Sequence, residues 1–339
     1  MAPLTNENTR VIDKASLDHA DDATAGSTGT DFPCVAVLVP CYNEEAAISK
    51  VVRDFRGALP GATIYVYDNN SRDRTIEVAR AAGAVIGFET LQGKGNVVRR
   101  MFADVEADVY VMVDGDDTYD SSVAPYLISM LLDRHLDMVN ARRLTDMVEA
   151  YRSGHRLGNK LLSGMVYMIF GNRCRDVLSG YRVLSRRFVK SFPALSEGFE
   201  IETELTIHAL ELRMPIAEVD TTYRARAEGS TSKLRTYRDG IRICWNIFHL
   251  LKEERPFQLF GAVFVALTLF SAVIIIPIFV TYFETGLVPR FPTAVLATGT
   301  MLVAFLSLFC GLVLETVTLG RREAKRMRYL AYSSPGRRL

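Results

Sequence analysis

Short apolar segments alternate with longer amphipathic segments through the first two thirds of the chain. Continuous apolar runs predict buried strands at residues 35–39, 63–67, 84–88 and 109–113. The intervening segments predict helices at residues 44–59, 75–82 and 95–107. Ser71 is a candidate cap for the second of these helices. This alternation predicts an α/β protein with a parallel, doubly wound sheet, and such sheets bind ligands beyond the carboxyl ends of their strands.

The last third of the chain contains two long runs without a charged residue, Leu259–Phe283 and Thr293–Leu314. Each run exceeds the ~20 apolar residues that a helix needs to cross a bilayer. A buried helical hairpin in a soluble protein is the alternative, but two such runs in tandem are typical of a membrane hairpin. Basic residues lie just before the first run and again after Leu319, with only Arg290 between the runs. The positive-inside rule therefore predicts a multi-pass protein of the inner (cytoplasmic) membrane, with the α/β domain and both termini cytoplasmic.

The amino-acid composition further limits the class of protein to which the chain can belong. The chain has 339 residues and a formal net charge of +1, so it lacks the basic field of a nucleic-acid-binding protein. Its five cysteines are scattered and fit reduced thiols in the cytosol. The expected organisation is a disordered tail (1–33), an α/β domain (34–234), an amphipathic juxtamembrane helix (235–256), two transmembrane helices (257–319) and a basic cytoplasmic tail (320–339).

Polar and acidic residues gather where the predicted strands end. The fourth strand runs directly into Asp114-Gly115-Asp116-Asp117, and clustered carboxylates at a strand end favour a divalent cation such as Mg²⁺ or Mn²⁺. A solvated turn is the alternative for this segment taken alone. The other strand ends are 40–44 and 68–71, and the turn 93–95 precedes the fourth strand. Together they indicate a nucleotide site, in which Asn and Asp bind base and ribose while Lys94 faces a phosphate.

These motifs resemble those of a known family. Val39-Pro40-Cys41-Tyr42-Asn43-Glu44-Glu45, Asp68-Asn69-Asn70-Ser71, Gly93-Lys94-Gly95 and Asp114-Gly115-Asp116 resemble the family 2 glycosyltransferases. Downstream, the segments 140–143, 179–182 and 198–202, with Arg226 and Ser232-Lys233, are similar to the polyprenyl-phosphate glycosyltransferases, which include dolichyl-phosphate mannose synthase. The resemblance covers about residues 34–234, and the C-terminal hairpin matches the membrane-anchored members.

The resemblance implies a glycosyltransferase A fold, which is a Rossmann-like mixed sheet, and inverting transfer of a sugar from a nucleotide sugar to a lipid phosphate. It implies nucleotide-sugar binding by Pro40, Tyr42, Asn43, Glu44, Asp68, Asn69, Lys94, Asp114 and Gly115. It places the metal, Mg²⁺ or Mn²⁺, on Asp114 and Asp116, and catalysis on Asp114, Asp116, Arg142 and Arg226. The acceptor phosphate is expected at Arg142, Arg156, Arg182, Arg226 and Lys233, and a homo-oligomer, a tetramer, is expected in the membrane.

One position departs from the family pattern. Many relatives carry Gln as a metal ligand two residues after the second Asp, where this chain has Thr118. Asp117, Thr118 or a water molecule is therefore the candidate for the next ligand.

The chemistry of a phosphate acceptor supports the same function independently of the family resemblance. A phosphate acceptor is already ionised near neutral pH, since its second pKa is about 6, so it needs positioning by arginines more than a general base. A UDP-sugar is favoured as donor and GDP-mannose is the alternative. The competing functions are a processive polysaccharide synthase and a non-catalytic membrane scaffold or flippase partner. Trp245 lacks the Gln-x-x-Arg-Trp context of the processive synthases.

Overall fold

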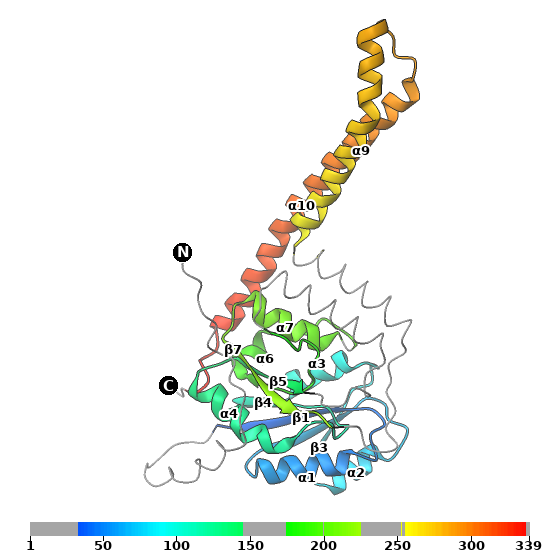
Figure 1. Cartoon of the computed structure of the whole chain (residues 1–339). Helices are drawn as coiled ribbons and strands as arrows, with labels where there is room; N and C mark the ends of the chain where they lie inside the picture. The colour runs from blue at the N-terminus through cyan, green and yellow to red at the C-terminus, as the bar shows by residue number, and fades with distance from the viewer. Residues whose placement is uncertain (1–32, 145–173, 199, 225–251, 253–254, 337–339) are drawn as a thin grey trace. The chain divides into compact units, whose positions relative to one another are not determined.

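The computed structural model describes residues 33–144, 174–198, 200–224, 252 and 255–336. The chain forms two compact units, one of Met1–Gly240 with Lys325–Leu339 and one of Ile241–Ala324. The first is an α/β domain and the second contains the two apolar helices (Figure 1).

The α/β domain is built on one seven-stranded sheet with the order β3-β2-β1-β4-β6-β5-β7. The strands are β1 (Val35–Cys41), β2 (Thr63–Asp68), β3 (Val85–Phe88), β4 (Val109–Met112), β5 (Met138–Leu144), β6 (Arg182–Ser185) and β7 (Ile216–Thr222). All neighbouring strands pair in parallel except β6, which is antiparallel to both β4 and β5. The mixed glycosyltransferase A sheet is therefore confirmed, and the all-parallel sheet expected from the alternation alone is corrected at β6.

Helices cover both faces of this sheet (Figure 1). They are α1 (Ile48–Ala58), α2 (Thr75–Ala81), α3 (Lys94–Asp104), η2 (Ser121–Val123), α4 (Ala124–Asp133), α6 (Arg186–Ser191) and α7 (Ile201–Glu211). Side chains of α1, α2 and α4 pack on one face of the sheet, while those of α3, α6 and α7 pack on the other. Because both faces are buried, the central strands are apolar at nearly every position.

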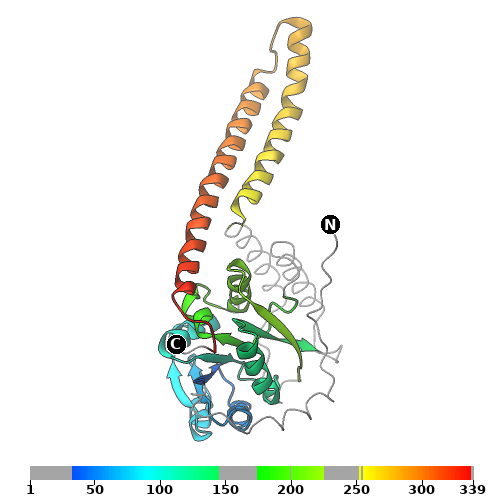
Figure 2. The same cartoon turned by 90° about the vertical axis from the view of Figure 1, so that its left-hand side faces the viewer.

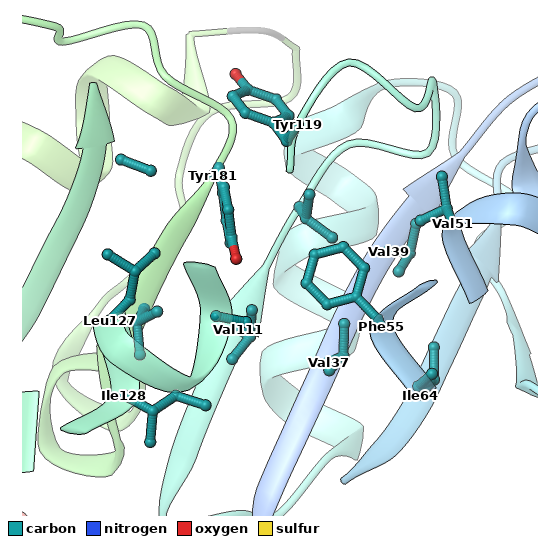
Figure 3. Packing of buried hydrophobic residues seen from close by; sticks show 14 of the residues in the cluster. Val37, Val39, Val51, Phe55, Ile64, Val111, Tyr119, Leu127, Ile128 and Tyr181 are labelled. Atoms are coloured by element: carbon teal, nitrogen blue, oxygen red, sulfur yellow. The ribbon is translucent and has the colours of Figure 1, made fainter. Parts of the chain in front are cut away.

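The core on the α1 side continues up to the strand ends. Val37, Val39 and Val111 pack against Phe55 of α1 (Figure 3). The Tyr181 ring lies edge-on to both Phe55 and Tyr119, at centroid distances of 5.9 and 5.5 Å. Tyr119 follows the acidic segment, so this aromatic contact anchors the acidic segment to the core.

Two local predictions differ from the structure. The helix expected from residue 44 begins at Ile48, because residues 45–47 form a turn instead. Ser71 does not cap α2, which begins at Thr75 with Arg74 as its N-cap. The Ser71 hydroxyl instead accepts a hydrogen bond from the backbone N–H of Asn43, at 2.9 Å, and so links the ends of β1 and β2.

The second unit contains two helices long and apolar enough to cross a membrane, α9 (Pro256–Thr285) and α10 (Phe291–Leu330). They lie side by side and are joined by a short turn at Gly286 (Figure 2). The juxtamembrane helix predicted at 235–256 lies outside the described residues, apart from residues 252, 255 and 256.

Candidate active site

Three strand ends meet at one edge of the sheet. In the parallel register Cys41 lies beside Asp68, and Leu38 of β1 lies beside Met112 of β4. The segments that follow β1, β2 and β4 therefore emerge together, as the alternation predicted. The backbone N–H of Asn69 donates to the carbonyl of Cys41 at 2.9 Å, which joins two of these segments directly.

Lys94 connects two acids at this edge. Its Nζ lies 2.5 Å from Asp114 Oδ1 and 2.5 Å from Glu202 Oε1. The side chains of Lys94 and Glu202 are 10% and 7% exposed, whereas that of Asp114 is 30% exposed. Asp114 is thus the member of this group that a ligand reaches from solvent.

The surroundings shift the pKa values of the buried pair. Burial alone would lower the pKa of Lys94, but the charges of Asp114 and Glu202 outweigh it and raise that pKa. Burial raises the pKa of Glu202, although Lys94 opposes the shift. Lys94 is therefore a fixed positive charge beside the acidic strand end.

Close backbone packing places Lys94. Gly93 has a φ of +135°, and a Cβ on Gly95 would lie 2.0 Å from the carbonyl oxygen of Ser196. The backbone N–H of Gly95 donates to the carbonyl of Glu197 at 3.0 Å. Only glycine allows this turn to lie so close to the segment before α7, which brings Lys94 to Glu202.

Asp116 is buried, at 4% exposure, and is supported by its neighbour. The Thr118 hydroxyl donates to Asp116 Oδ1 at 2.6 Å, and Thr118 itself is 1% exposed. Asp117 has a φ of +58° and binds Lys50 of α1, with 2.7 Å between Oδ1 and Nζ. Asp117 therefore turns towards α1, and the Thr118 hydroxyl supports Asp116. Asp114 and Asp116 remain the predicted metal ligands.

The predicted nucleotide-binding residues divide into two groups. The Asn69 side chain is 3% exposed, and it bonds the backbone of Glu89, Leu91 and Gly93, so it shapes the 89–93 loop. The Asn43 side chain accepts from the backbone N–H of Arg72. By contrast, Asp68 Oδ1 is buried without a hydrogen-bond partner among the described residues. The remaining candidates lie at the end of β1, which is next to β2, and after β4; they are Pro40, Tyr42, Glu44 and Gly115.

The arginines predicted to bind the acceptor phosphate also differ in how exposed they are. Arg142, on β5, makes a two-pronged ion pair with Asp220 of β7 and keeps 21% of its side chain exposed. Arg182 is fully buried, which corrects its expected place at the acceptor phosphate. Arg156, Arg226 and Lys233 lie outside the described residues.

Sequence reasoning missed the partners of these residues. Glu202 lies within the 198–202 motif, yet no local pattern predicts that it binds Lys94. Asp220, which pairs with Arg142, and Lys50, which pairs with Asp117, carried no local pattern that predicted those contacts. All three pairings join separate elements of the sheet or its helices, so periodicity alone does not reveal them.

The acidic residues fit a divalent cation held by few protein ligands. No group of three His, Cys, Asp or Glu close enough to hold a metal occurs in the described part of the chain. Mg²⁺ commonly binds one or two carboxylates and completes its shell with water and substrate phosphate oxygens. Asp114 and Asp116, two residues apart after β4, are the two carboxylates available to such a cation, and Asp114 is reached from solvent.

Comparison with known proteins shows the family. The profile described as "Glycosyl transferase family 2" matches residues 36–192. Glycosyltransferase AglJ of Haloferax volcanii is 34% identical over 231 residues, covering 68% of this chain and 76% of the relative. A dolichyl-phosphate hexose transferase of the same organism is 31% identical over 224 residues, covering 66% and 96%.

A solved structure shares the fold. Glucosyl-3-phosphoglycerate synthase of Mycobacterium tuberculosis, in complex with Mn²⁺, UDP and glucosyl-3-phosphoglycerate, superposes with a TM-score of 0.53 at 24% identity. The match covers 64% of this chain and 80% of that one. By its sequence relatives and its mixed sheet, this chain belongs to glycosyltransferase family 2 and is a glycosyltransferase.

Proposed function

We propose that this enzyme transfers a hexose-type sugar, with inversion, from a nucleotide sugar to the phosphate of a membrane polyprenyl phosphate. A UDP-sugar is the favoured donor and GDP-mannose the alternative. The observation that carries the proposal is the cluster of Asp68, Asp114 and Asp116 with Lys94 at one sheet edge. The name of the dolichyl-phosphate hexose transferase relative supports a lipid-phosphate acceptor.

The residues of this edge suit the departure of a nucleoside diphosphate. Asp114 and Asp116 would hold Mg²⁺ or Mn²⁺, which when bound neutralises charge that develops on the diphosphate. Lys94 supplies a permanent ammonium beside Asp114, because its raised pKa keeps it protonated. Asp68, with its unpartnered buried oxygen, suits the nucleoside hydroxyl or amide groups.

The acceptor requires orientation more than deprotonation. A phosphate monoester is largely dianionic at neutral pH and is itself the nucleophile. Arg142, fixed by Asp220 and partly exposed, presents a guanidinium that suits phosphate oxygens. Helices α9 and α10 could anchor the enzyme in the membrane that contains the prenyl chain, with the catalytic domain in the cytoplasm.

A reconstituted assay tests this function. The purified full chain in polyprenyl-phosphate vesicles would be given a panel of UDP- and GDP-sugars with Mg²⁺ or Mn²⁺. Formation of a polyprenyl-phosphate sugar from one donor is the expected result. Transfer only to a soluble acceptor, or to a growing polysaccharide, would exclude the proposed acceptor.

Asp116→Asn gives the sharpest variant for the metal assignment. It removes the ligand charge but keeps the side-chain shape, so we expect transfer to fall by about 100-fold or more with the fold unchanged. Asp133→Asn, at the exposed end of α4, is the matched control and should retain wild-type activity. Asp116→Asn activity close to that of the control would contradict the assignment.

A further inference from the structure

Arg182 has a buried guanidinium for which the proposed chemistry has no direct use. It lies at the start of β6 and is fully buried. Its N–H groups meet the carbonyl oxygens of Val177, Ser179 and Glu202, the hydroxyl of Thr206 and the sulfur of Met138. Since arginine has five N–H donors, this set occupies the whole fork. A substrate phosphate therefore has no donor of Arg182 to bind.

Two of these bonds reach segments that touch Asp114. Arg182 Nε donates to the carbonyl of Ser179 at 3.0 Å, and a Cβ on the next residue, Gly180, would lie 2.2 Å from Asp114 Oδ2. Arg182 Nη2 donates to the carbonyl of Glu202 at 2.9 Å, and the Glu202 side chain holds Lys94. Lys94 in turn contacts Asp114 Oδ1. Both oxygens of Asp114 are thus bordered by segments that Arg182 ties together.

The charges of this group balance. Arg182 and Lys94 contribute two positive charges, and Asp114 and Glu202 contribute two negative charges. Burial lowers the pKa of Arg182, while the charge of Glu202 raises it. A buried charge is tolerated when opposite charges and hydrogen bonds compensate it, so the four groups depend on one another for their positions.

We propose that Arg182 is a positioning residue of the donor site. It fixes residues 177–180 and the start of α7, and through them it sets the places of the Asp114 carboxylate and the Lys94 ammonium. That these two groups bind a nucleoside diphosphate rests on the proposed function. Arg182 acts on the donor through Asp114 and makes no contact with the acceptor phosphate.

Gly180→Ala and Arg182→Met test this proposal in the full chain. Gly180→Ala leaves Arg182 in place but pushes a methyl group against Asp114, whereas Arg182→Met releases both segments. Calorimetric titration with UDP and GDP in Mg²⁺ first shows which nucleotide the wild-type enzyme binds. Each variant should bind that nucleotide at least about tenfold more weakly than the wild type does. In transfer assays, the KM for polyprenyl phosphate should change by less than about threefold.

The controls separate positioning from other roles. Gly57→Ala, at a position of α1 with no atom within 4 Å of the added Cβ, should bind nucleotide as the wild type does. A raised acceptor KM with unchanged nucleotide affinity in Arg182→Met would make Arg182 an acceptor ligand and overturn the proposal. Wild-type nucleotide affinity in a folded Arg182→Met would also overturn it. If circular dichroism shows Arg182→Met to be unfolded, Arg182→Lys, which keeps the buried charge but cannot make all the bonds of the fork, takes its place and should show the same weakened nucleotide binding. If the wild type transfers no sugar to polyprenyl phosphate, the proposed function fails, while the nucleotide titrations still test Arg182.

Discussion

At the scale of single residues, His208 shows how burial decides the chemistry of a side chain. It lies on α7 at 1% exposure, with the rings of Phe188 and Phe192 each 5.3 Å from its own. Its Nε2 lies 3.0 Å from the Ser191 hydroxyl. Burial, with a smaller effect from Lys325, lowers the pKa of His208 to about 3. The ring is therefore neutral in the folded enzyme and has a structural role.

This pKa predicts a pH-dependent stability. Below its ordinary value of about 6.5, the unfolded chain binds a proton that the folded chain refuses until about pH 3. The contribution of His208 to the free energy of unfolding is complete above pH 6.5 and falls by up to about 1.4 kcal/mol per pH unit below it. Thermal melts of the wild type and His208→Gln in detergent should show their stability difference shrinking from pH 7 to pH 5. A constant difference would contradict the buried neutral ring.

At the scale of elements, the two apolar helices pack through small residues. The buried positions of α10 within the hairpin are Ala297, Ala304, Gly311 and Thr318, one every seventh residue. Ser271 of α9 donates to the carbonyl of Ala297 at 2.9 Å. Small side chains on this face let the two helix backbones approach closely. Such close packing can stabilise a helix pair in lipid, where no hydrophobic driving force acts between helices.

Two glycines of α10 give a matched test of this packing. A Cβ on Gly311 would lie 2.9 Å from the Cβ of Phe260, whereas a Cβ on Gly299 would meet no atom within 4 Å. We expect Gly311→Ala to destabilise the hairpin by roughly 1–2 kcal/mol, and Gly299→Ala to leave it unchanged or slightly stabilised. Unfolding in SDS, followed by far-UV circular dichroism, measures both. Equal effects would show that Gly311 does not lie at a tight contact.

At the scale of the whole molecule, the end of the chain belongs to the α/β domain. Residues 320–339 were expected to form a basic cytoplasmic tail. In the structure α10 continues to Leu330, and Lys325–Leu339 groups with the domain. The Tyr329 hydroxyl donates to Asp137 Oδ2 at 2.8 Å, and the Arg187 guanidinium lies 4.8 Å from the Tyr329 ring centroid. Asp137 directly precedes β5, whereas Arg142 lies towards the other end of that strand.

Lys325 offers the test of this docking. Its Nζ lies 2.7 Å from Glu211 Oε2, and the Glu211 side chain is 2% exposed. Lys325→Met would leave a buried carboxylate short of its cation, so we expect a loss of about 1–3 kcal/mol in the stability of the α/β domain. Arg326→Met, at the exposed neighbouring position, is the control. Denaturation of the full chain should separate the two variants, and identical curves would mean that the C-terminal segment does not support the domain.

The antiparallel direction of β6 is a feature of the fold that the local sequence pattern did not predict. Each strand from β1 to β4 was predicted within a few residues. Strands β1 and β4 are buried on both faces, which leaves a continuous apolar run in the sequence. The direction of β6 is seen only in its antiparallel pairing with β4 and β5, which are distant in sequence, so the local run 182–185 carries no information about it. The family resemblance predicted a mixed sheet where the local alternation did not.

The sequence by itself determined the acidic strand end, its neighbours at the sheet edge and the two apolar helices, because these depend on local composition and on strand periodicity. Only the tertiary structure decided which charged and polar side chains contact one another. Lys94 reaches Glu202 across 108 residues and Tyr329 reaches Asp137 across 192. It also decided that Arg182 is buried while Arg142 is partly exposed, although both are arginines in predicted phosphate-binding motifs. Burial and pairing arise from long-range packing, and the pattern of neighbours along the chain does not encode them locally.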